Sequence, residues 1–321
     1  MLFKLLLLFS ISKAVLSSDG DRSPFYIKCV KNCNTANCTK EDQFKPHIAV
    51  TQDIWNKVLW WSCDDECRYN CMWKTVQGFN ERGFSIPKFH GKWPFTKIMG
   101  VQEPASAFAS MLNLVVHTCM YHKIMNKFSI KTMPIVLFWH IFAVVCMNAW
   151  LWSTIFHTRD NYFTEFMDYA CALSMVIMLF IAAIIRVFHK RRKLSAVVLL
   201  ATTLYYGEHV RYLYTGKIDY DYNMLVNIFF GVAGSLIWLL WGGVQYVSGR
   251  RECWRLMAFT LLSGAALTLE LFDFPPRFGW DTHALWHLAT VPLPILFYRF
   301  VIDDLMYLKL SASGKSSFKL M

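Results

Sequence analysis

The chain has 321 residues, of which 55% are hydrophobic and 17% are charged, with 13 Trp and 26 Phe. A soluble domain does not need so much apolar surface, and several stretches reach the roughly 20 apolar residues that cross a bilayer. The net charge of +11 would suit nucleic-acid binding, but basic residues of membrane proteins gather in cytosolic loops. We therefore expect a membrane-embedded, multi-pass protein that binds no nucleic acid.

Residues 1–18 have the pattern of a signal peptide. Lys4 supplies a short positive region, residues 5–9 form an apolar core, and Ser17 or Ser18 is a small residue at a suitable cleavage point. The alternative is a short uncleaved membrane anchor. Cleavage near residue 18 would leave residues 19–98 in the lumen of the secretory pathway.

Most of the cysteines precede the first long apolar stretch. They are Cys29, Cys33, Cys38, Cys63, Cys67 and Cys71. An even set in a secreted segment predicts about three disulfides, whose pairing the spacing does not determine. Cys-x3-Cys spacing would also suit a zinc knuckle, which an oxidising lumen disfavours. The sequon Asn37-Cys38-Thr39 predicts glycosylation of Asn37, as expected of a luminal segment.

Seven apolar stretches follow the cysteine-rich segment. We predict membrane-spanning helices near 103–121, 134–156, 164–186, 194–213, 222–246, 256–274 and 283–304. The first is short and the fourth carries Glu208, His209 and Arg211, so these two have the weakest pattern. The predicted fold is an all-α membrane protein. It consists of a seven-transmembrane helix bundle over 99–305, a small disulfide-rich luminal N-terminal segment and a tail over 306–321.

The distribution of lysine and arginine predicts the orientation. These residues concentrate in 122–133, 186–193, 250–255 and the tail, whereas the alternate loops hold only Arg159, Lys217 and Arg277. The basic loops are expected in the cytosol. The N-terminus is then luminal and the C-terminus cytosolic, as the signal peptide and the sequon also require.

Polar residues mark one end of three predicted spans. Ser153 and His157 close the second, Asp168 begins the third, and His283 and His287 open the seventh. Four-residue spacing places two side chains on one helix face, and the predicted topology puts all five near the luminal surface. Three histidines with an open fourth position are typical of catalytic zinc. We therefore predict a zinc site at His157, His283 and His287.

Other interpretations of these residues remain. The chain has ten histidines, so a single pair four residues apart is weak evidence for a metal site. The zinc prediction rests on the expected position of all five polar residues at the same depth in the membrane. Asn113, His117 and His140 could join the site but more often make hydrogen bonds between helices. Glu270 and Asp273 could orient a ligand imidazole or simply cap a helix.

The combined pattern resembles the CREST superfamily of seven-span hydrolases, which includes alkaline ceramidases and progestin/adiponectin receptors. Its signature is Ser-x3-His, a later Asp, and His-x3-His in the last span, and all five positions match. The segments 89–95, 102–106, 269–276 and 281–287, together with the Cys-rich head, look like the Per1-like branch. The resemblance covers essentially the whole mature chain.

The resemblance implies removal of the sn-2 acyl chain from the GPI lipid of GPI-anchored proteins during fatty-acid remodelling. The expected location is the Golgi membrane, with the endoplasmic reticulum as the alternative. His157, His283 and His287 would hold Zn²⁺, Asp168 would be the general base, and Ser153 would donate a hydrogen bond to the developing oxyanion or, alternatively, act as a nucleophile. A ceramidase-type amidase, a seven-span receptor and a non-catalytic escort for GPI-anchored cargo are the rival functions. The oligomeric state stays open.

Overall fold

A computed structural model describes residues 18–216, 218–272 and 274–312. The described residues are helical and contain no strand beyond isolated bridges. They divide into two compact units at Gly100. Nearly all of the predicted signal peptide, Asp273 and the end of the predicted cytosolic tail lie outside the described residues.

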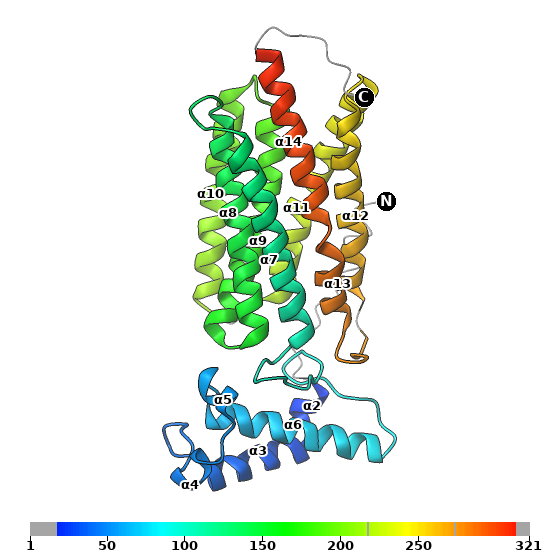
Figure 1. The fold of residues 1–321 in the computed structure, drawn as a ribbon. Coiled ribbons are helices and arrows are strands. Elements are labelled where there is room, and N and C mark those ends of the chain that lie inside the picture. Colours follow the sequence, from blue (N-terminus) through cyan, green and yellow to red (C-terminus); the bar gives the residue numbers. More distant parts are fainter. Residues whose placement is uncertain (1–17, 217, 273, 313–321) are drawn as a thin grey trace. The chain divides into compact units, whose positions relative to one another are not determined.

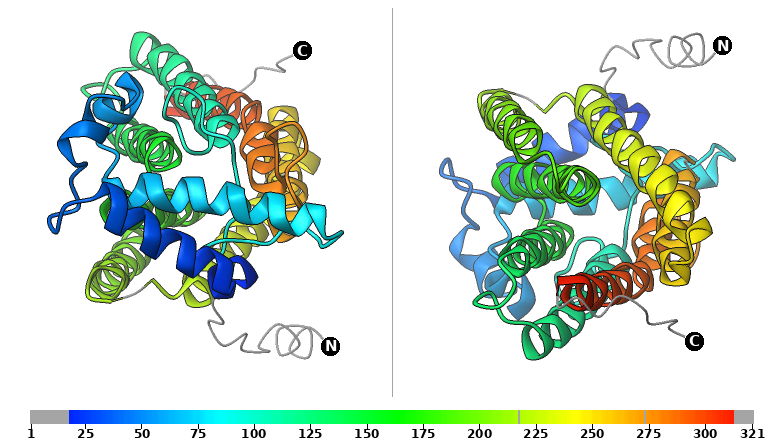
Figure 2. Two further views of the ribbon diagram at one scale, coloured as in Figure 1. Left: turned by 90° about the horizontal axis from the view of Figure 1, so that it is seen from below. Right: turned by 90° about the horizontal axis from the view of Figure 1, so that it is seen from above.

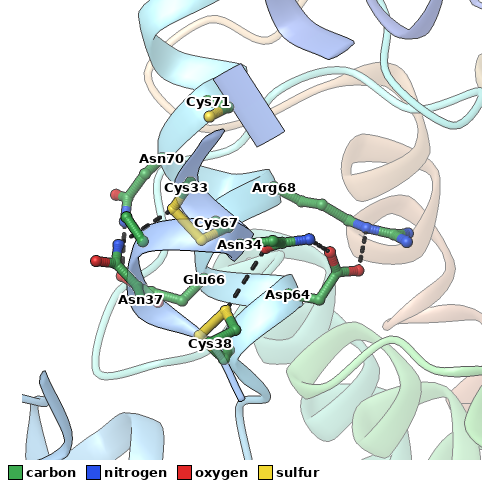
Figure 3. The surroundings of a disulfide bond; sticks show 12 residues. Cys33, Asn34, Asn37, Cys38, Asp64, Glu66, Cys67, Arg68, Asn70 and Cys71 are labelled. Atoms are coloured by element: carbon green, nitrogen blue, oxygen red, sulfur yellow. Dashed lines mark hydrogen bonds and ion pairs between the residues drawn. A yellow bond between two sulfur atoms is a disulfide. The ribbon is translucent and has the colours of Figure 1, made fainter. Parts of the chain in front are cut away.

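The first unit is built around two helices, α3 (Pro24–Asn37) and α6 (Cys63–Glu81), that disulfides link. Its other elements are α2 (Asp19–Arg22), α4 (Pro46–Ala49) and α5 (Ile54–Val58). The disulfides join Cys29 to Cys71, Cys33 to Cys67 and Cys38 to Cys63, and Figure 3 shows the bond between Cys33 and Cys67. The prediction of three disulfides is confirmed. The zinc-knuckle alternative fails because zinc requires thiolates, and all six sulfurs are bonded in pairs.

A ring of long helices forms the second unit. These are α7 (Pro104–Lys127), α8 (Ile135–Thr158), α9 (Tyr162–Val187), α10 (Arg192–Tyr214), α11 (Tyr220–Val247), α12 (Trp254–Leu271), α13 (Thr282–Thr290) and α14 (Leu293–Ala312), with a 3₁₀ turn η1 (Arg251–Cys253). Figures 1 and 2 show them side by side. Helix α7 packs against α8, α13 and α14, α9 joins α8 to α11, and α12 packs against α11 and α14. Helix α10 packs against α9.

Within the described residues, four helical segments are long and apolar enough to cross a membrane. They are α8, α9, α11 and the stretch from α13 through α14. Helices α7, α10 and α12 coincide with the other three predicted spans, but their mean hydropathy is lower than that of the four segments. The prediction of an all-helical membrane protein is therefore confirmed, whereas the count of seven spans stays a prediction.

The buried core of the second unit is aromatic. Trp139 and Phe142 of α8 pack against Phe297 of α14, with ring centroids 6.0 and 5.3 Å away. Tyr298 also contacts Phe142, and its hydroxyl lies 3.2 Å from Nδ1 of the buried His117 on α7. These contacts hold α14 against α7 and α8, and thereby fix α13, which precedes α14 in the chain.

The last predicted span is broken in two. Pro292 has no N–H to bond the carbonyl of Leu288, and the Val291 N–H donates to that carbonyl instead, at 3.2 Å. The carbonyl of His287 is thereby released from the helix ladder, and it accepts a hydrogen bond of 2.9 Å from Asn113 on α7. The single helix predicted over 283–304 is thus two segments, and α7 stabilises the break.

A buried charge network joins three parts of the ring. The Asp304 carboxylate of α14 accepts two hydrogen bonds from Arg186 of α9, at 2.5 and 2.7 Å, and one from Arg250, at 2.8 Å. All three residues are buried. A carboxylate shared by two buried guanidinium groups is costly to remove, because Arg186 then loses this counter-charge and Arg250 keeps only its pair with Glu252, at 2.9 Å.

Asp304→Asn is expected to lower the free energy of unfolding by about 3–5 kcal/mol, the usual cost of leaving buried charges unpaired. Asp303→Asn is the matched control. Its pair with Arg255, at 2.7 Å, joins side chains that are 29% and 34% exposed, so the loss should stay below about 1 kcal/mol. Denaturant unfolding of both purified variants in mild detergent measures the difference. Equal losses would contradict the role given to the network.

Candidate metal centre

Three histidines from distant parts of the sequence meet at one end of the ring. His157 lies in the last turn of α8, and His283 and His287 lie on α13. Nε2 of His283 is 3.3 Å from Nε2 of His157 and 2.8 Å from Nε2 of His287. Their potential ligand atoms all lie within 4.8 Å of one another. The structure therefore brings together the three predicted zinc ligands, and this group could hold a metal ion.

The start of α13 sets the position of two of these histidines. Asp281 caps the helix, because its Oδ1 accepts a hydrogen bond of 2.8 Å from the N–H of Ala284. His283 consequently falls in the first turn and His287 one turn later on the same face. Helix α13 packs beside α7 and α12 (Figure 1), which turns this face toward the end of α8.

The end of α8 is held by the residues that precede α7. The carbonyls of His157 and Thr158, which lack partners within the helix, accept hydrogen bonds from the N–H groups of Glu103 and Gln102, at 3.0 and 3.1 Å. Pro104 then begins α7. These two bonds tie the beginning of α7 to the last turn of α8 and place the Glu103 side chain beside the His157 ring.

Glutamate carboxylates contact Nδ1 of two of the histidines, the ring nitrogen that faces away from the group. Oε2 of Glu103 lies 2.8 Å from Nδ1 of His157, and Oε2 of Glu270 lies 2.7 Å from Nδ1 of His283. An ionised carboxylate only accepts hydrogen bonds, so each Nδ1 carries the proton. The Nε2 atoms are then lone-pair donors that face one another, as in histidines that bind a metal.

This arrangement fits zinc. If all three Nε2 atoms carry lone pairs, their approach to 2.8 and 3.3 Å is favourable only with a cation between them. Two nitrogens that each lie about 2.0–2.1 Å from a tetrahedral zinc are roughly 3.3 Å apart. The His157–His283 separation matches this value, and the His283–His287 pair needs to open by roughly half an ångström to reach it. The donor set, three imidazoles with no fourth ligand from the described residues, matches that of a catalytic zinc site.

Two serines continue the site behind His287. Oγ of Ser110 on α7 lies 3.4 Å from Nδ1 of His287 and 3.0 Å from Oγ of Ser153 on α8. Both serines are buried. If Nδ1 of His287 carries its proton, Ser110 accepts from it and donates to Ser153. The proton of Ser153 is then available for a further acceptor.

Asp168 lies on α9, outside the histidine group. It is half-buried and is not among the residues whose ligand atoms gather within 4.8 Å. The next residue, Tyr169, packs against Phe156, which precedes His157, with ring centroids 6.4 Å apart. Asp168 therefore lies at about the level of the histidines along the ring, and its role as general base stays a prediction.

The remaining candidates have other surroundings. Asn113 and His117 bond neighbouring helices, as described above, and the ring of His140 packs against Tyr121. Asn37 is half-buried at the end of α3, where its Nδ2 lies 3.4 Å from Sγ of Cys33 (Figure 3). Its glycosylation stays a prediction.

Sequence reasoning missed two members of the site. Glu103 stands in the segment 102–106, which carried the family resemblance, but no role followed from it. Ser110 gives no signal, because a small residue on an apolar helix is common. Glu270, in contrast, was a candidate for orienting a ligand, and it lies where that role requires.

Glu103→Gln is expected to weaken zinc binding by about 10–100-fold, because the amide orients the His157 ring but no longer raises its basicity. Glu270→Gln should cost less, since the Glu270 side chain is 19% exposed and that of Glu103 only 9%. Glu208→Gln, at an exposed ion pair with Arg211 on α10, is the control. Competition with a chromophoric chelator measures all three affinities, and an unchanged Kd for Glu103→Gln would rule out this role.

Known proteins resemble the chain over nearly its whole length. A family model described as the Per1-like family matches residues 54–305. "Post-GPI attachment to proteins factor 3" of Drosophila melanogaster is 41% identical over 309 residues, which cover 94% of this chain and 93% of the relative. "GPI-specific phospholipase A2-like PGAP3" is 41% identical in Danio rerio over 94% of both chains, and 37% identical in Homo sapiens over 97% of both. No solved structure matches the chain significantly.

Proposed function

The chain belongs to the Per1-like family, as the resemblance predicted, and from this premise we propose that it is a zinc-dependent lipid hydrolase. Its substrate would be the GPI anchor of GPI-anchored proteins, from which it removes the sn-2 acyl chain during fatty-acid remodelling. The observation that carries the proposal is the convergence of three Nε2 atoms while carboxylates hold two of the Nδ1 atoms. The names of the relatives supply the substrate class.

His157, His283 and His287 would hold the ion. When bound, zinc would supply Lewis acidity, which polarises an ester carbonyl and lowers the pKa of water toward 7. Asp168 would accept the proton of the attacking water and return it to the leaving alcohol oxygen. The acyl C–O bond breaks, the water oxygen stays with the fatty acid, and the lysolipid keeps the alcohol.

The surroundings of Ser153 favour a donor role over a nucleophilic one. A nucleophilic serine needs a base within hydrogen-bond reach, but Ser153 reaches His287 only through Ser110. With a proton on Nδ1 of His287, this chain runs from the imidazole toward Ser153. Ser153 would therefore donate its own proton to the oxygen that becomes negative in the transition state.

The same proposal includes a topology. The ring from α7 to α14 would cross the membrane seven times, with the basic loops in the cytosol. The signal peptide would end near residue 18, residues 19–98 would lie in the lumen, and residues 306–321 in the cytosol. The end of α8 and the start of α13, and with them the histidines, would then lie at the luminal side of a Golgi or endoplasmic reticulum membrane, where the GPI lipid is expected.

Positional labelling of the substrate tests the proposal. Purified protein is reconstituted with a GPI-anchored protein that carries distinguishable acyl chains at sn-1 and sn-2, and the products are identified by mass. Release of the sn-2 chain alone is expected. Cleavage of a ceramide amide in its place would favour the amidase. Absence of turnover on either lipid would favour the receptor or the escort.

A further inference from the structure

The connection between α12 and α13 exposes large apolar side chains next to the metal centre. We call residues 274–281 the Phe278 loop. Phe274 is 40% exposed and Phe278 is fully exposed, whereas Trp280 is half-buried and Asp281 is buried. Leu271 and Phe272, which lead into the loop, are also exposed, at 53% and 64%, and apolar side chains gathered in this way mark a surface that contacts a membrane or another apolar partner.

The backbone holds Phe278 away from the protein. Arg277 and Trp280 exchange two hydrogen bonds, of 2.9 and 3.0 Å, and so close a two-residue hairpin. Phe278 and Gly279 between them have φ of +53° and +80°, the signs that a type I′ turn requires. Asn-Gly is the favoured pair in such a turn, and phenylalanine rarely adopts positive φ. Phe278 therefore stands at a strained tip, and such strain is typical of functional positions.

The loop begins and ends at the metal centre. Glu270, in the last turn of α12, bonds His283, in the first turn of α13, at 2.7 Å. This contact closes the base of the connection. The His283 side chain is 33% exposed and that of His157 only 2%, so His283 marks the accessible side of the centre. The Phe278 loop therefore extends from the side on which a substrate can approach.

We propose that the Phe278 loop is the lipid-contacting rim of the site. This inference rests on the proposed function. It adds that Phe278 inserts among the acyl chains of the luminal leaflet and positions the lipid substrate beside His283. Thr282 begins a stretch that is apolar and long enough to cross a membrane, and Phe278 lies four residues before it. Four residues extend at most roughly 14 Å, which keeps the ring near the interface, where aromatic side chains are enriched.

Two substrates separate membrane contact from catalysis. Phe278→Ser is expected to lower kcat/KM by about tenfold on an ester lipid embedded in vesicles, because the ring no longer enters the leaflet. Its activity on a water-soluble short-chain ester should equal that of the wild type, and Phe278→Leu should keep most of the vesicle activity. An equal loss on both substrates, or no loss on either, would overturn the proposal.

A second measurement does not need turnover, so it separates failure of this inference from failure of the proposed hydrolase. An environment-sensitive fluorophore is attached at Phe278→Cys in the full-length protein, with Cys119→Ser to remove an exposed free thiol, and the protein is reconstituted into phospholipid vesicles. Blue-shifted emission and loss of intensity with nitroxide-bearing lipids are expected, with weaker effects at Arg277→Cys. Quenching by aqueous iodide instead would place the tip in water. Resistance to both quenchers would place it against protein, such as a second copy, and either result would overturn the proposal.

Discussion

His287→Ala is expected to reduce deacylation of a GPI lipid by on the order of 10³-fold or more, because the proposed chemistry depends on an ion that this ring would help to hold. His287 is buried, and its Nε2 lies 2.8 Å from that of His283. With two imidazoles left, zinc would bind far more weakly. Lysolipid formation and retained zinc, measured on the same purified sample, should fall together.

His117→Ala is the matched control for this loss. His117 is also a buried histidine of the ring, but its partner is Tyr298 and it is outside the metal group. Its replacement should cost stability and leave the zinc content unchanged. If His287→Ala kept its zinc and its activity, or if both variants lost zinc equally, His287 would not be a ligand.

Asp168→Asn is expected to lower kcat by about 10²–10⁴-fold, the usual contribution of a general base, without loss of zinc. Asparagine keeps the size of the side chain but does not accept the proton. Retention of the ion is expected because Asp168 is not in the histidine group. Rate and zinc content together therefore separate this variant from the ligand variants.

Asp221→Asn, at an exposed carboxylate in the first turn of α11, serves as the comparison for Asp168. It should leave kcat unchanged. Full activity of Asp168→Asn would move the role of base to another carboxylate near the histidines, of which Glu103 and Glu270 are the closest. Loss of zinc from Asp168→Asn would instead make it a ligand.

The helices were predictable because a long apolar stretch leaves few alternatives to a helix that crosses a membrane. Helix α8, for example, covers Ile135–Thr158, close to the predicted 134–156. The break at Pro292 was not predicted, because the stretch around it is continuously apolar. Asn113, which stabilises the break, lies on another helix and is 174 residues away in sequence from its partner His287.

The disulfides show the same division between local and long-range information. Cysteine number and compartment predicted the bonds, but spacings of four or five residues along each segment allow several pairings. The pairing follows from the antiparallel arrangement of α3 and α6, in which the outermost cysteines, Cys29 and Cys71, join each other. That arrangement is a tertiary property.

In the metal centre, four-residue spacing along a helix identified His283 and His287. The predicted position of His157, at the same luminal end of the bundle, added the third ligand. The partners that orient them could not be found in this way. Glu103 reaches His157 across 54 positions and Ser110 reaches His287 across 177, so only the packing of α7 against α8 and α13 brings them together.

Metal analysis of the purified protein beside its His283→Ala/His287→Ala double variant tests the central claim most directly, with lyso-GPI formation followed in the same samples. About one zinc per chain in the wild type, and joint loss of zinc and deacylation in the variant, are the predicted results. A wild type that deacylates without metal, or a variant that still deacylates, would contradict the proposed centre.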